Sequence, residues 1–173
     1  IAVGLVNVGS TVLSMFLIDK IGRRKLYFIG VTGMMLALAT LAAFFFFKDD
    51  LGDNLKWVTV GTVLVYIMFF AISLGPLGWL IISEIFPLKI RGVGMSIGAL
   101  SNLFFNGIVA FTFLKLAWLF TGDGMEITKT VIKDGQEVVQ TDPNPAGAFF
   151  LYALIAVLGL FWGYKYIPET KGV

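Results

Sequence analysis

The stretch Gly75-Pro76-Leu77-Gly78-Trp79, followed by Ser83-Glu84-Ile85-Phe86-Pro87, decides how this chain folds. It belongs to an apolar segment at residues 57–82, which at ~1.5 Å per residue is long enough to cross a ~30 Å hydrocarbon core. Proline lacks a backbone donor and crowds the preceding turn, so we expect the helix to break at Gly75, Pro76 and Gly78. Because a bilayer satisfies no freed backbone group, the stretch predicts a bend that lines a pocket within a helix bundle.

The composition indicates a membrane protein. Of the 173 residues, 58% are hydrophobic and 14% are charged, whereas soluble domains are ~45–50% apolar and about a quarter charged. Five apolar segments are candidates to cross a bilayer, and we expect the spans at residues 1–18, 26–47, 57–82, 93–119 and 148–167. The predicted fold class is therefore all-α, a polytopic bundle of five transmembrane helices. The alternative, a soluble domain, would have to bury five nearly uncharged helices.

One sizeable polar region, residues 120–147, separates the last two spans. Its strand-like runs at residues 127–132 and 136–139 are joined by Asp134-Gly135, a dipeptide with a strong preference for hairpin turns. We therefore expect a small β-hairpin outside the membrane. A mobile loop is the alternative, because an isolated two-stranded hairpin is only marginally stable in water.

The distribution of charge predicts the orientation in the membrane. The connections at residues 19–25, 83–92 and 165–173 share one side and carry eight Lys and Arg residues against three acids. The opposite side carries five basic residues against eight acids. Because short loops rich in Lys and Arg stay in the cytoplasm, we expect a multi-pass protein of the cell membrane with a cytoplasmic carboxy terminus and an extracellular hairpin.

Polar side chains within the spans have two interpretations. Gly94, Gly98, Asn102 and Asn106 follow one another at spacings of four, so they share one face of the fourth span. Small residues and amides at such a face are typical of helix–helix packing. An amide also offers both donors and an acceptor to a ligand rich in hydroxyl groups. Asn7 in the first span, which begins a stripe continued by Ser10, Thr11 and Ser14, has the same two interpretations.

Trp79 favours the ligand interpretation. An interfacial Trp lies at a helix end, among the lipid headgroups, whereas Trp79 lies within its span, three residues after Pro76. An indole in that place is suited to stack on the apolar face of a sugar ring while its N–H bonds a hydroxyl. Ordinary packing in a bundle is the alternative.

The charged residues of the cytoplasmic side indicate a latch. Asp19 and Arg23 are four residues apart, Glu84 and Arg91 are seven apart, and Arg23 or Arg24 is placed to reach Glu84 as a bidentate pair. Ion pairs at helix ends suit a two-state gate that breaks as a bundle opens. Topology signalling is the alternative; it explains the basic residues but not Glu84.

No constellation of residues supports an enzyme. The chain has no Cys and no His, and it shows no nucleophile beside a base and no phosphate-binding loop. We expect no cofactor, no metal and no nucleic-acid partner.

Four motifs follow one another along the chain: Asp19-Lys20-Ile21-Gly22-Arg23-Arg24, Gly75-Pro76-Leu77-Gly78-Trp79, Ser83-Glu84-Ile85-Phe86-Pro87 with Arg91, and Pro168-Glu169-Thr170-Lys171-Gly172. In order and spacing they resemble the carboxy-terminal half of a sugar porter of the major facilitator superfamily. The resemblance covers nearly the whole chain and implies that the five spans are helices eight to twelve. Residues 1–173 would then form one half-domain, whose partners are the lipid bilayer and the amino-terminal half of the same transporter.

The resemblance also implies roles for individual residues. Those that contact or line the sugar site would be Asn7, Phe70, Trp79, Asn102 and Asn106. Those in a cytoplasmic charge network that stabilises the outward-facing state would be Asp19, Arg23, Arg24, Glu84, Arg91 and Glu169. One departure is Leu103, since family members often have Trp directly after the helix-eleven Asn.

The function implied is secondary transport of a monosaccharide, a hexose or pentose, by alternating access around a midplane site. We expect coupling to a proton, although the titrating acid of proton-coupled relatives lies in the amino-terminal half. The alternatives are a facilitated-diffusion uniporter, a transport-inactive sugar sensor, and a helical scaffold in which Trp79 and the Asn residues only pack.

Overall fold

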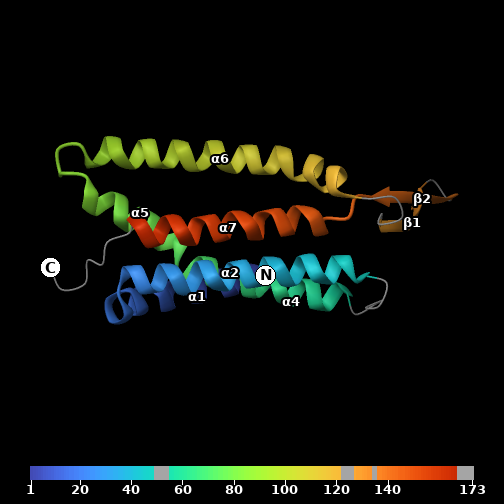
Figure 1. The fold of residues 1–173 in the computed structure, drawn as a ribbon, viewed down its shortest axis with the longest axis horizontal. Helices are drawn as coiled ribbons and strands as arrows, with labels where there is room; N and C mark the ends of the chain where they lie inside the picture. Colours follow the sequence, from blue (N-terminus) through green and yellow to red (C-terminus); the bar gives the residue numbers. More distant parts are fainter. Residues whose placement is uncertain (49–54, 122–126, 134–135, 167–173) are drawn as a thin grey trace.

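The computed structural model describes residues 1–48, 55–121, 127–133 and 136–166. The chain forms six helices and one hairpin in these ranges (Figure 1): α1 (Ala2–Ile21), α2 (Arg23–Phe46), α4 (Leu55–Ile72), α5 (Leu74–Ile85), α6 (Arg91–Phe120), β1 (Ile127–Lys133), β2 (Gln136–Asp142) and α7 (Ala146–Tyr166). With α4 and α5 taken as one segment, five helices are long and apolar enough to cross a membrane. The prediction of an all-α bundle with five spans is confirmed.

The helices lie side by side along the long axis of the molecule, and the hairpin extends beyond α6 and α7 at one end (Figure 1). The most buried span is α2, which packs against α7 and α4, whereas α6 touches α5 and α7 and leaves most of its surface open. The buried share of the span is 39% for α2 and 6% for α6. Gly22, with a φ of 91°, makes the tight turn between α1 and α2 that a side chain would strain.

Small residues let α2 approach its neighbours. A Cβ added to Gly163 of α7 would lie 2.2 Å from the ring of Tyr27 on α2. The Tyr27 hydroxyl donates to the carbonyl of Gly159 at 2.7 Å, so the same ring both fills this contact and finds its polar partner there. Close approach and a bond across helices are what hold membrane helices together, because lipid is as apolar as their side chains.

The third span is broken, but the predicted position of the break was wrong. The helix is interrupted at Ser73, with φ −118° and ψ −88°, and Gly75, Pro76 and Gly78 lie inside α5. Proline acts on the preceding turn: it has no N–H for the carbonyl four residues earlier and its ring crowds that carbonyl. That carbonyl belongs to Ile72, the last residue of α4, so the break falls directly after it.

The polar region after α6 forms the predicted β-hairpin. Strands β1 and β2 pair antiparallel in a register that runs from Ile127 opposite Asp142 to Lys133 opposite Gln136. The predicted turn, Asp134-Gly135, lies outside the described residues. The hairpin is confirmed as a structural element.

Asn144 ties three helix ends together at the base of the hairpin. Its Nδ2 donates to the carbonyl of Phe45 on α2 at 2.9 Å, and its Oδ1 accepts from the Ala146 N–H at 3.0 Å where α7 begins. Its backbone N–H donates to Oγ1 of Thr121, directly after α6, at 2.9 Å. We call this group the Asn144 clasp; through Asn144 it links the ends of α2, α6 and α7.

We expect Gly30→Ala to destabilise the bundle. A Cβ at this position of α2 would lie 1.7 Å from Ser73 Oγ and 3.2 Å from the Phe69 carbonyl, so the helix break would have to move. The expected loss in the free energy of unfolding is ~1–3 kcal/mol, as for an overpacked core. Thermal unfolding in detergent measures it. Gly61→Ala in α4 is the control, because nothing lies within 4 Å of its added Cβ; an equal loss there would contradict the packing argument.

Candidate functional site

The five residues predicted to contact a ligand are all exposed, on four helices. Asn7 is on α1, Phe70 on α4, Trp79 on α5, and Asn102 and Asn106 on α6. Helix α5 contacts both α1 and α6, so the helix that carries Trp79 lies between those that carry the amides. Trp79 is 43% exposed. The structure places these residues on neighbouring helices and leaves their side chains accessible.

The Gly and Asn residues of the stripe along α6 do different things. A Cβ at Gly94 would lie 2.5 Å from the Phe86 ring, and one at Gly98 would lie 2.7 Å from Ile82 Cδ1, so these glycines allow α5 and α6 to pack. Asn102 and Asn106, further along the helix, are exposed instead. The packing interpretation therefore describes the glycine half of the stripe only.

The two amides of α6 form a pair. Asn106 Nδ2 donates to Asn102 Oδ1 at 2.8 Å, and this is their one side-chain hydrogen bond within the described residues. The pair leaves the amide N–H groups of Asn102 and the Oδ1 of Asn106 available as donors and acceptor. Lipid offers no hydrogen-bond partner to such groups. The face that carries them therefore requires polar partners from a water-filled cavity or from another polypeptide.

A cavity of about 530 Å³ at the hairpin end has a different character. Its lining comes from α2, α6 and α7 and consists mainly of Phe and Ala side chains, with Asn144 as a polar member. The Asn144 side chain already bonds Phe45 and Ala146. This cavity therefore offers few donors or acceptors to a polar ligand, and none of the five predicted residues lines it.

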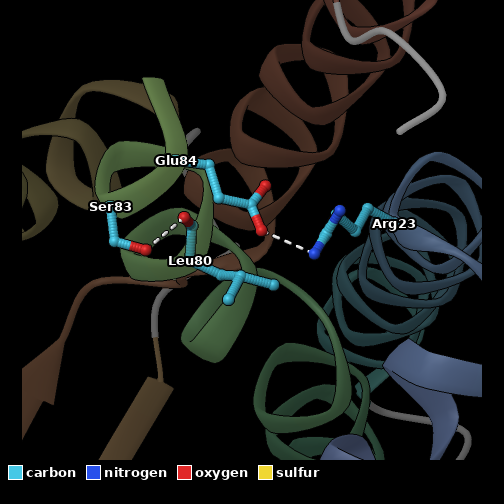
Figure 2. Close-up of polar contacts among 4 residues, drawn as sticks. All are labelled: Arg23, Leu80, Ser83 and Glu84. Atoms are coloured by element: carbon cyan, nitrogen blue, oxygen red, sulfur yellow. Dashed lines mark hydrogen bonds and ion pairs between the residues drawn. The ribbon is translucent and has the colours of Figure 1, made fainter. Parts of the chain in front are cut away.

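Arg23 and Glu84 form an ion pair across the end of the bundle opposite the hairpin. Figure 2 shows the Glu84 carboxylate of α5 pointing toward the guanidinium of Arg23 at the start of α2; Nη2 and Oε1 are 2.5 Å apart. The Ser83 hydroxyl beside it donates to the Leu80 carbonyl at 2.7 Å, also drawn in Figure 2. Glu84 is 37% exposed, which limits such a pair to roughly 0–1 kcal/mol.

Each member of this pair opposes the dipole of its own helix. Glu84 is in the last turn of α5, where the dipole is negative, and Arg23 is the first residue of α2, where it is positive. Alone, each charge would cost ~0.3–1 kcal/mol at low ionic strength. Facing each other, the two charges offset part of this cost.

The other residues of the predicted charge network are arranged differently. Arg24 donates to the Tyr164 carbonyl at 3.1 Å and lies over the ring of Tyr164, so it joins α2 to α7. Arg91 begins α6, and its buried Nε has no hydrogen-bond partner within the described residues. Asp19 is exposed in the last turn of α1. Glu169 lies outside the described residues.

Sequence reasoning missed the polar contact between Ser14 and the helix break. The Ser14 hydroxyl of α1 donates to the carbonyl of Ile72 at 2.7 Å, 58 residues away in the chain. The sequence did indicate that a donor was needed, because Pro76 leaves the carbonyl four residues earlier without its backbone N–H. Which helix supplies that donor depends on packing and does not follow from the local sequence.

Five helices long and apolar enough to span a membrane, one of them interrupted before a proline, define a polytopic helical membrane bundle. The sequence profile described as "Sugar (and other) transporter" matches residues 1–173, the whole chain. The chain belongs to this family, within the major facilitator superfamily.

Relatives with different transport functions in their names match along the whole chain. D-xylose-proton symporter-like 1 of Arabidopsis thaliana is 36% identical over 173 residues, which are 100% of this chain and 29% of the relative. The facilitated trehalose transporter Tret1-2 homolog of Drosophila sechellia is 33% identical over 174 residues, 99% of this chain and 31% of the relative. The chain thus spans somewhat less than a third of the length of these relatives.

Solved structures of a bacterial member share the fold. The inward-open xylose transporter XylE from E. coli superposes with a TM-score of 0.70 at 29% identity and covers 98% of this chain and 32% of that one. The structure of the proton:xylose symporter XylE bound to 6-bromo-6-deoxy-D-glucose superposes with a TM-score of 0.73 at 30% identity. The match covers 98% of this chain and 31% of that one.

We predict that Glu84→Gln opens the end of the bundle that carries the ion pair. The change removes the negative charge that joins α5 to Arg23 of α2, so cysteine probes placed at this end should react faster with a water-soluble thiol reagent. The swapped variant, Arg23→Glu with Glu84→Arg, is the matched control. It keeps the pair and gives each helix end the charge that its dipole favours, so labelling should return to the original rate or below. Unchanged labelling in Glu84→Gln would refute the latch.

Proposed function

We propose that this chain is part of a secondary transporter that moves a monosaccharide, a hexose or pentose, by alternating access. The observation that carries the proposal is the exposed Asn102–Asn106 pair on α6, next to the helix that carries the exposed Trp79. The family supports transport of a sugar, and two relatives support the monosaccharide in particular. One relative is named D-xylose-proton symporter-like 1, and a solved relative holds 6-bromo-6-deoxy-D-glucose.

The proposed chemistry matches a sugar. Sugar hydroxyl groups both donate and accept hydrogen bonds. The amide pair offers both partners, because the Asn102 N–H groups remain free to donate and the Asn106 Oδ1 remains free to accept. The indole of Trp79 supplies an apolar plane for the C–H face of the ring, together with one N–H donor. Asn7 and Phe70, both exposed, extend the proposed site onto α1 and α4.

The proposed transport cycle uses the two ends of the bundle differently. Transporters of this kind rock two halves around a site near the midplane of the bilayer. The Arg23–Glu84 pair would close the cytoplasmic end in the outward-facing state and open as the halves rock. The cytoplasmic assignment rests on the basic residues of that side, and it makes the hairpin extracellular.

Proton coupling is part of the proposal, with facilitated diffusion as the second candidate. A relative named a proton symporter and one named a facilitated transporter match at similar identity, 36% and 33%. No acidic residue lies deep within a described span, since Asp19 and Glu84 are both within a turn of a helix end. A coupled proton would therefore need a titrating group from another part of the full-length transporter.

We predict that Trp79→Ala and Asn102→Ala each weaken sugar binding by the full-length transporter about tenfold or more. Trp79→Ala removes the stacking plane and Asn102→Ala removes a neutral hydrogen bond, each worth ~0.5–1.5 kcal/mol. Each change also leaves buried groups of the sugar without a partner, which adds to the loss of affinity. Isothermal titration with glucose and with xylose measures the effect. Trp118→Ala is the matched control, because this Trp of α6 is 47% exposed but lies near the hairpin end. Unchanged affinity in both site variants would refute the assignment.

A second measurement tests the coupling. In vesicles that contain the full-length transporter, uptake of labelled sugar against its gradient should collapse when a protonophore is added. Uptake that only equilibrates, and does so at the same rate with and without the protonophore, would show facilitated diffusion instead. Sugar binding without any uptake would point to a sensor.

A further inference from the structure

We propose that Ser14 is a positioning residue of the sugar site: it replaces the backbone donor that Pro76 lacks and so fixes the broken helix against α1. Its hydroxyl donates to the Ile72 carbonyl at 2.7 Å. The consequence for sugar binding rests on the proposed function, whereas the consequence for the helix break does not.

The Ile72 carbonyl needs this donor. In a continuous helix it would accept from the N–H of residue 76, but residue 76 is a proline. The next amide, of Leu77, donates to the Ser73 carbonyl at 3.0 Å. Within a bilayer, a main-chain carbonyl left without a donor costs free energy that water cannot recover. Ser14 Oγ is the group placed to satisfy it.

The surroundings leave no room for water to take the place of the hydroxyl. Ser14 and Ser73 both have an exposed fraction of 0%. On the other side of the break, α2 closes in at Gly30, where an added Cβ would overlap the Ser73 side chain. The Ser73 hydroxyl is itself used, as a donor to the Phe69 carbonyl at 3.0 Å. The break is therefore enclosed between α1 and α2, with Ser14 as the donor from α1.

The bond lies between two of the proposed sugar-contacting residues. Helices α1 and α4–α5 run in the same direction, since both end at the Arg23–Glu84 side. Asn7 precedes Ser14 by seven residues, about two turns, so it lies on the same side of α1 and ~10 Å nearer the hairpin end. Trp79 follows Ile72 by seven residues along α5, ~10 Å toward the opposite end. A shift of α5 at this bond would move Trp79 relative to Asn7.

The first experiment replaces the donor. In the full-length transporter, Ser14→Ala should speed hydrogen exchange of the amides of residues 73–75 and 77 about tenfold. It should also weaken glucose or xylose binding about fivefold, with the maximal uptake rate changed less than the affinity. Ser10→Ala is the matched control. Ser10 is one turn away on the same helix and is also buried, but it makes no side-chain hydrogen bond within the described residues. It should leave both measurements within twofold.

The second experiment restores the backbone donor. Pro76→Ala returns an N–H to residue 76, so adding Ser14→Ala in that background should change exchange and affinity by less than twofold. If Ser14→Ala alone does not fold but the double variant does, the inference is supported in a stronger form. An equal effect of Ser14→Ala in both backgrounds, or failure of the double variant to fold as well, would overturn it. If the unmodified transporter binds no sugar, the proposed function fails, and the exchange measurements still decide the role of Ser14.

Discussion

Main-chain groups inside a bilayer find no water, and the arrangement of the third span depends on this constraint. Pro76 takes away the donor that the Ile72 carbonyl would use, and the helix breaks directly after that residue. The Ser14 hydroxyl supplies a donor from a helix 58 residues earlier in the chain. Gly30 lets a third helix close over the same place. Helices α1, α2 and α4–α5 thus meet at the place where the proline removes an N–H.

Burial is divided unequally among the helices, and the proposed function follows that division. Helix α2 packs against α4 and α7 through small residues and aromatic rings, so it is the central packing helix of the bundle. Helix α6 is bound to α5 by Gly94 and Gly98, and beyond them it presents Asn102 and Asn106 to its open side. A single helix therefore combines a packing segment with a polar segment. All four residues follow one another at intervals of four, so both segments lie along the same face of α6.

Much of the fold could be predicted because it follows from local patterns: apolar segments of span length, and alternating runs on either side of Asp134-Gly135. The break was misplaced because a proline acts on a carbonyl four residues earlier. Whether Arg23 or Arg24 meets Glu84 was left open, since neighbours on a helix point ~100° apart and only the packing of α2 decides. Arg23 faces α5 and Arg24 faces α7. The partner of Ser14 is likewise a property of the assembled bundle.

The Asn144 clasp has a consequence for how the sequence can vary. Because Thr121 and Asn144 are bonded to each other and Asn144 is bonded to Phe45, the two ends of the hairpin segment are anchored independently of what lies between them. Lengthening an anchored surface segment costs little, ~0.6 kcal/mol for each doubling. We therefore expect the hairpin to tolerate insertions, which makes it a suitable place to graft an epitope or a fluorescent reporter without disturbing the helices.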